Sequence, residues 1–75
     1  MMAITATQCR MARAALRIGV LELAAMAKVA TGTITRLEAG EELKPRTLDA
    51  IQAAFEKAGV EFTNGDAPGV RLKKR

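Results

Sequence analysis

The fold of this chain is decided by residues 23–40, which read Leu-Ala-Ala-Met-Ala-Lys-Val-Ala-Thr-Gly-Thr-Ile-Thr-Arg-Leu-Glu-Ala-Gly. The pattern predicts two short helices joined by a tight turn. Side chains are about 100° apart around a helix, so Ile34, Leu37 and Glu38 share one side of the second helix. The other side carries small, polar and basic residues: Thr31, Gly32, Thr35 and Arg36. A short helix with this outward face fits the major groove of DNA, which makes DNA binding the first hypothesis.

Four helices are expected in all, over residues 5–17, 20–27, 30 or 31 to 40, and 48–58. Thr5 and Gln8 have the spacing of a capping box, in which a hydroxyl and an amide satisfy backbone donors reciprocally. Gly19 separates the first two helices, and Gly40 is expected to end the third. After a connector over residues 41–46, Thr47 is expected to cap the fourth helix. The inward apolar residues of that helix are Leu48, Ile51, Ala54, Phe55 and Ala58.

After Gly59 the apolar residues change from a helical period to the alternation of strands. Residues 60–62 and 70–72 alternate apolar and charged side chains, and residues 63–69 between them are rich in turn formers. This pattern predicts a C-terminal hairpin that packs on the first and fourth helices or pairs with a second subunit. Its apolar face would carry Val60, Phe62, Val70 and Leu72.

Composition excludes several classes of protein. Seventy-five residues make one small domain, whose marginal stability dimerisation would increase. A single Cys9 excludes an internal disulfide, and without His a structural metal site is not expected. The usual catalytic bases are scarce, so we expect neither an enzyme nor a cofactor. No segment resembles a signal peptide or an apolar run of the ~20 residues that span a membrane, so we expect a cytoplasmic protein.

The net charge of +4 comes from the C-terminal end. The last five residues carry four of the twelve cations and no acid, so residues 1–70 hold eight charges of each sign. A nucleic-acid interface must therefore be argued from where the charges lie.

Several stretches match a family pattern in order and spacing: Leu23-Ala24, Ala27, Val29, Thr33-Ile34, Leu37-Glu38, Gly40, and residues 8–13, 58–62 and 69–72. Through them the chain resembles the phage repressor/Cro class of helix-turn-helix regulators, the xenobiotic-response-element family. The resemblance implies a mainly α fold: a four-helix, lambda-repressor-like helix-turn-helix domain with a short C-terminal β-hairpin. The DNA-binding domain would cover residues 1–59, the hairpin residues 60–72, and a basic tail residues 73–75.

The resemblance also implies roles for individual residues. The base-reading positions would be Thr31, Gly32, Thr35 and Arg36. The residues that contact the DNA backbone or minor groove would be Thr33, Lys44 and Arg46. Arg13 and Glu38 would form a buried ion pair between the first and third helices. The residues support this pair independently, because Glu38 lies on the inward face, where an unpaired carboxylate is costly.

Four positions depart from the family pattern. Gly19 and Ala30 stand where capping side chains are usual, and Val20 where a phosphate-binding Gln is common. Lys28 occupies a turn position usually given to Gly, where a left-handed backbone would cost about 1–2 kcal/mol. These departures remove polar DNA contacts, so selectivity would depend on Arg36, on DNA shape and on dimer spacing.

The expected function is sequence-specific binding of double-stranded DNA by a homodimer on an inverted repeat, which represses transcription, often of the regulator's own operon. Two alternatives remain open: an antitoxin or other protein-interaction module that uses the same domain, and a non-specific architectural DNA-binding protein. Arg36 could instead pair with a surface Glu. Arg10, Arg17 and the tail are expected to be solvated or to contact phosphates, and Cys9 to pack as a small apolar residue.

Overall fold

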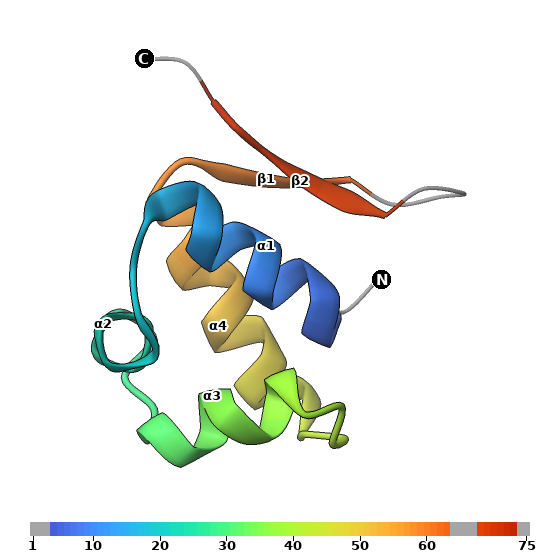
Figure 1. The fold of residues 1–75 in the computed structure, drawn as a ribbon. Helices are drawn as coiled ribbons and strands as arrows, with labels where there is room; N and C mark the ends of the chain where they lie inside the picture. Colours follow the sequence, from blue (N-terminus) through green and yellow to red (C-terminus); the bar gives the residue numbers. More distant parts are fainter. Residues whose placement is uncertain (1–3, 64–67, 74–75) are drawn as a thin grey trace.

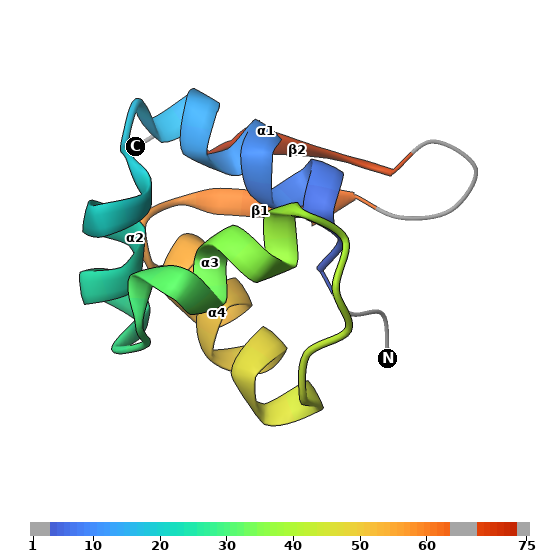
Figure 2. The same ribbon diagram turned by 60° about the horizontal axis from the view of Figure 1, so that its bottom comes forward.

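The computed structural model describes residues 4–63 and 68–73, which form a mainly helical domain with a short antiparallel hairpin. The elements are α1 (Ala6–Leu16), α2 (Val20–Ala27), α3 (Thr31–Glu38), α4 (Pro45–Lys57), β1 (Val60–Thr63) and β2 (Gly69–Leu72). In Figure 1, α1 and α4 lie in the middle, with the hairpin on one side and α3 on the other. Figure 2 turns α3 toward the viewer, where it lies in front of α4 and beside α2.

The large buried side chains of the core come from α2, α3, α4 and β1. Leu23 of α2, Ile34 of α3, and Ile51 and Phe55 of α4 are each fully buried, as is Val60 of β1. The ring of Phe62 packs edge-on against that of Phe55, with 5.9 Å between the ring centroids. Burial of each large apolar side chain contributes about 1.5–3 kcal/mol, which makes these residues the main source of stability.

The capping box at the start of α1 is present as predicted. The Thr5 hydroxyl accepts the Gln8 N–H at 3.1 Å, and the Gln8 side-chain oxygen accepts the Thr5 N–H at 3.1 Å. Gln8 also makes hydrogen bonds to the hairpin, which its spacing from Thr5 does not predict. Its buried amide nitrogen donates to the carbonyls of Thr63 and Gly69, at 3.0 and 3.2 Å, and so ties the loop end of the hairpin to α1.

The predicted start of the fourth helix is wrong. Thr47 does not cap it, because α4 begins three residues earlier than predicted, at Pro45, with Lys44 as the N-cap. The Lys44 carbonyl accepts the N–H groups of Thr47 and Leu48, at 2.9 and 3.1 Å. Proline at the first helical position has its φ angle preset, lacks an N–H that would be unpaired anyway, and keeps the residue before it extended. These effects outweigh the capping preference of Thr47.

α2 has its predicted bounds, whereas the C-terminal ends of the other three helices differ from the predictions by one or two residues. The first helix ends at Leu16 rather than Arg17, which is a C-cap with a left-handed backbone at φ 58°. The third ends at Glu38 with Ala39 as its C-cap, and Gly40 follows with φ 92°, a conformation that favours glycine. The fourth ends at Lys57.

The hairpin has the predicted faces. Val60 pairs with Leu72, and Phe62 pairs with Val70. β1 contacts α4, and β2 contacts α1. Leu72, the last residue of β2, is nevertheless 51% exposed. The expected turn over residues 64–67 and the tail residues Lys74 and Arg75 lie outside the described residues.

Candidate nucleic-acid interface

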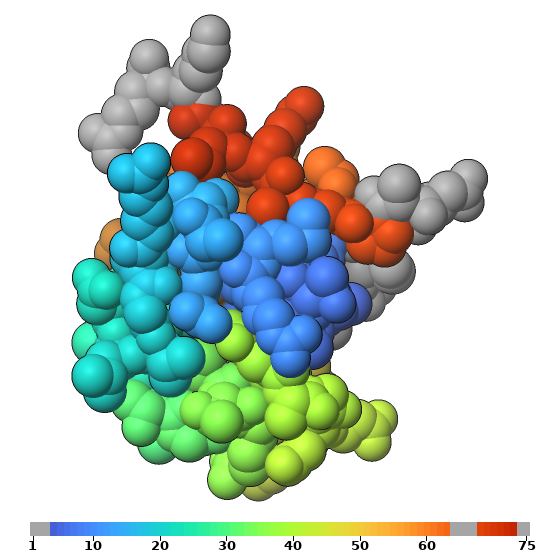
Figure 3. All heavy atoms as spheres, viewed as in Figure 1, coloured from blue at the N-terminus to red at the C-terminus, as the bar shows by residue number. Residues whose placement is uncertain are grey.

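The predicted division of α3 into two faces is correct. Ile34, Leu37 and Glu38 are buried, whereas the four expected base-reading residues are exposed: Thr31, Gly32, Thr35 and Arg36. Thr33, the expected phosphate contact, is half-buried. In Figure 3, α3 and the connector that follows it form the surface farthest from the hairpin. The outward face of α3 is therefore open to a partner.

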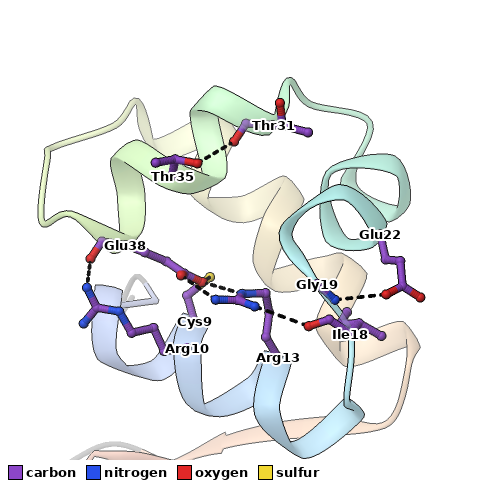
Figure 4. Close-up of polar contacts among 9 residues, drawn as sticks. All are labelled: Cys9, Arg10, Arg13, Ile18, Gly19, Glu22, Thr31, Thr35 and Glu38. Atoms are coloured by element: carbon purple, nitrogen blue, oxygen red, sulfur yellow. Dashed lines mark hydrogen bonds and ion pairs between the residues drawn. The ribbon is translucent and has the colours of Figure 1, made fainter.

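Glu38 joins the end of α3 to α1. Its two carboxylate oxygens accept from Nε and Nη2 of Arg13, both at 2.7 Å, so that the ion pair is bidentate. Nη1 of Arg13 donates to the carbonyl of Ile18 at 3.3 Å, and Arg10 donates to the backbone carbonyl of Glu38. Figure 4 shows the two arginines reaching Glu38 from α1. The pKa of Glu38 is lowered, chiefly by the hydrogen bonds from Arg13, although burial opposes this shift.

Cys9 is also part of this network, which its sequence pattern did not indicate. The side chain is fully buried, as expected for a small apolar residue, but its Sγ also donates to Oε2 of Glu38 at 3.1 Å. Burial, and then the hydrogen bond to Glu38, raise the pKa of the Cys9 thiol to about 12. The thiolate is disfavoured, so this cysteine has none of the properties of a nucleophile or a redox sensor.

The raised pKa of Cys9 predicts a loss of stability in alkali. The folded thiol stays protonated above its ordinary pKa of 9.0, at which an unfolded chain loses the proton. The stabilisation is therefore complete below pH 9 and disappears between pH 9 and about 12, with a slope of up to about 1.4 kcal/mol per pH unit. Denaturant unfolding at several pH values should show the free energy of unfolding falling more steeply above pH 9 in the wild type than in Cys9→Ala. Parallel curves for the two proteins would contradict this assignment.

The turn between α2 and α3 is formed, although Lys28 stands at a turn position where glycine is usual. Lys28 adopts a left-handed backbone at φ 58°, and the N–H of Val29 donates to the Ala24 carbonyl at 3.0 Å. The Ala30 N-cap provides no side-chain hydrogen bond. At the start of α2, Glu22 accepts the N–H of Gly19 at 3.0 Å, which is the half of a capping box that glycine allows. The turn is therefore formed at a cost in local stability.

Replacing Lys28 with Gly should stabilise the protein. The substitution removes backbone strain of about 1–2 kcal/mol, but glycine also increases the conformational entropy of the unfolded chain. The free energy of unfolding should therefore rise by about 0.5–1 kcal/mol. The melting temperature should rise by about 3–6 °C in a thermal scan. Ala25→Gly is the matched control, because Ala25 is exposed inside α2 and its substitution should destabilise. A lower melting temperature for Lys28→Gly would show that the left-handed backbone carries no strain.

The connector between α3 and α4 brings charges of both signs beside the exposed face of α3. An open hollow of about 480 Å³ is lined by Thr33, Arg36, Glu41, Glu42, Leu43, Lys44 and Thr47. Arg46 is exposed at the second position of α4. The cations lie where the sequence pattern predicts them, and Glu41 and Glu42 of the same connector, for which no role was predicted, lie beside them. The alternative that Arg36 pairs with a surface Glu is not found, because within residues 4–63 and 68–73 Arg36 forms no ion pair.

The described residues form neither a cluster of metal ligands nor a membrane-spanning helix. No group of three or more His, Cys, Asp or Glu residues there is placed to hold a metal ion. None of the helices formed by the described residues combines the length and apolarity needed to cross a bilayer. No protein-family model matches the chain, and no curated protein matches it significantly.

Proposed function

We propose that the protein binds double-stranded DNA as a helix-turn-helix transcriptional regulator, with α3 as the recognition helix of a lambda-repressor-like domain. One observation carries this proposal: the exposed face of α3 presents small residues and Arg36, which forms no ion pair within the described residues. Lys44 lines the same hollow as Arg36, and Arg46 is exposed two residues later. A two-turn helix with this face fits the major groove, and the flanking cations suit the phosphates on either side. A regulator bound in this way would repress by covering a promoter.

The rigid attachment of α3 supports the proposal. Base recognition requires side chains held within a fraction of an ångström by the residues behind them. Arg13 and Arg10 of α1 hold the last residue of α3 by its side chain and its backbone carbonyl, and Ile34 and Leu37 bury the inner face. The inward residues of α3 would therefore position the outward ones.

The charges of the connector set the expected strength of binding. Glu41 and Glu42 lie in the same hollow as Arg36 and Lys44, and they repel phosphates. The interface therefore has only a small excess of positive charge, and we expect affinity to be modest and to fall as salt increases.

The position of the hairpin limits which surface two copies could share in a homodimer. The hairpin lies on the opposite side of the domain from α3, so a two-fold axis through it would point the two α3 helices away from each other (Figures 1 and 2). The domain extends over 29 × 25 × 18 Å. Two copies side by side would bring their α3 helices close to the spacing of about 34 Å that separates half-sites one helical turn apart. We therefore propose that the copies meet beside α3 on an inverted repeat.

Arg46→Ala tests the proposed role of the connector. If Arg46 contacts a phosphate, the substitution should weaken binding to all sequences equally and reduce the slope of log affinity against log salt by about 1. Fluorescence anisotropy with a labelled duplex at several salt concentrations measures both quantities. Lys57→Ala is the control, because Lys57 is exposed at the far end of α4. An unchanged salt slope for Arg46→Ala, or the same change in Lys57→Ala, would exclude a phosphate contact at Arg46.

A second candidate is a protein-interaction module, such as an antitoxin. It is favoured by the mixed charges of the hollow beside α3 and by two exposed apolar side chains of α2, Leu21 and Met26. A neighbouring gene for a small toxin, together with no DNA binding, would support this candidate over the first.

A further inference from the structure

We propose that Thr35 selects thymine in the DNA site through its methyl group. This inference rests on the proposed function and specifies which base one position of α3 prefers. It starts from a hydrogen bond on the exposed face of the helix: the Thr35 hydroxyl donates to the backbone carbonyl of Thr31, at 3.2 Å (Figure 4).

This hydrogen bond limits what Thr35 can offer a base. A threonine hydroxyl has one hydrogen, and here that hydrogen is used within the helix. The acceptor groups that face the major groove, such as N7 and O6 of guanine and O4 of thymine, would therefore receive no hydrogen bond from Thr35. The side chain keeps a methyl group and the acceptor lone pairs of Oγ1.

The methyl group is free to contact DNA. Thr35 is exposed, and a Cβ built on Gly32, three residues earlier on the same face, meets no atom within 4 Å. The helix surface next to the exposed Thr35 is therefore open at Gly32. The apolar feature that DNA presents in the major groove is the 5-methyl group of thymine, which threonine methyls contact.

Paired substitutions separate the methyl group from the hydroxyl. Thr35→Val keeps the methyl and removes the hydroxyl, whereas Thr35→Ser keeps the hydroxyl and removes the methyl. We expect Thr35→Val to bind the selected duplex as the wild type does, and Thr35→Ser to bind it about four-fold more weakly. Both substitutions are at an exposed position, and thermal unfolding of each variant checks that the fold is retained.

The same methyl contact can also be removed from the DNA side. Each thymine of the selected half-site is replaced in turn by deoxyuridine, which lacks only the 5-methyl group. At one position this should weaken wild-type binding about four-fold and leave Thr35→Ser unaffected, because that variant has already lost the contact.

The outcomes distinguish the two proposals. If the wild type selects a motif but Thr35→Val loses affinity while Thr35→Ser does not, the hydroxyl contacts a base and the inference is overturned alone. The same conclusion follows if no deoxyuridine position discriminates between the wild type and Thr35→Ser. If the wild type selects no motif, the proposed function fails and this inference fails with it.

Discussion

Glu38→Ala should lower the melting temperature by at least about 10 °C. The substitution leaves the Arg13 guanidinium without its bidentate partner and the buried Cys9 thiol without an acceptor. Breaking a buried ion pair from one side costs about 3–5 kcal/mol. We expect a value near 3 kcal/mol, because the side chain of Arg13 is 23% exposed and water partly replaces the lost partner. One kcal/mol corresponds to about 4–8 °C in a domain of this size.

Controls separate the charge of Glu38 from its shape and from DNA binding. Glu38→Gln keeps the shape and should also destabilise. The lowered pKa of Glu38 means that its stabilisation is present above the ordinary value of 4.5 and is lost as the pH falls below it. The wild type should therefore lose its advantage over Glu38→Gln in acid. DNA affinity should fall only through loss of folded protein. Unchanged thermal stability of Glu38→Ala would remove the argument that this pair holds α3.

Arg36→Ala should reduce affinity for the selected duplex about 10- to 100-fold. Arg36 is the one member of the exposed face of α3 with a guanidinium, which can bind guanine O6 and N7 together for about 1–3 kcal/mol of discrimination. The base preference should relax at a single position of each half-site. Anisotropy titrations against the selected duplex and against random DNA measure this difference.

A matched comparison makes the Arg36 result specific. Lys57→Ala removes one positive charge at the far end of α4 and should leave both affinities nearly unchanged. Equal losses by Arg36→Ala on selected and random DNA would show that this residue contacts phosphate rather than a base.

The parts of the fold that depend on local sequence were predictable. The boundaries of α2 follow from Gly19 and the apolar run after it, and the capping box of α1 follows from the spacing of Thr5 and Gln8. The start of α4 was missed because two local signals compete there. Proline at position 45 and threonine at position 47 each indicate a helix start, and the preset φ angle of the proline prevails.

Contacts between distant residues were predictable only where a family pattern pointed to them. The ion pair of Arg13 with Glu38 was expected from the resemblance and from the inward position of Glu38. The thiol of Cys9 on the same carboxylate was not, because a cysteine in an apolar helix face indicates packing alone. The amide of Gln8 reaches carbonyls 55 and 61 residues away, a distance over which no local spacing rule applies.

Sequence-specific DNA binding by α3 can be tested by selecting bound sequences from a random pool of double-stranded DNA at near-physiological salt. We predict recovery of a palindromic motif whose half-sites lie about one helical turn apart, as two α3 helices in successive major grooves require. Folded protein that enriches no sequence, at concentrations high enough for a dimer to form, would contradict sequence-specific DNA binding by α3.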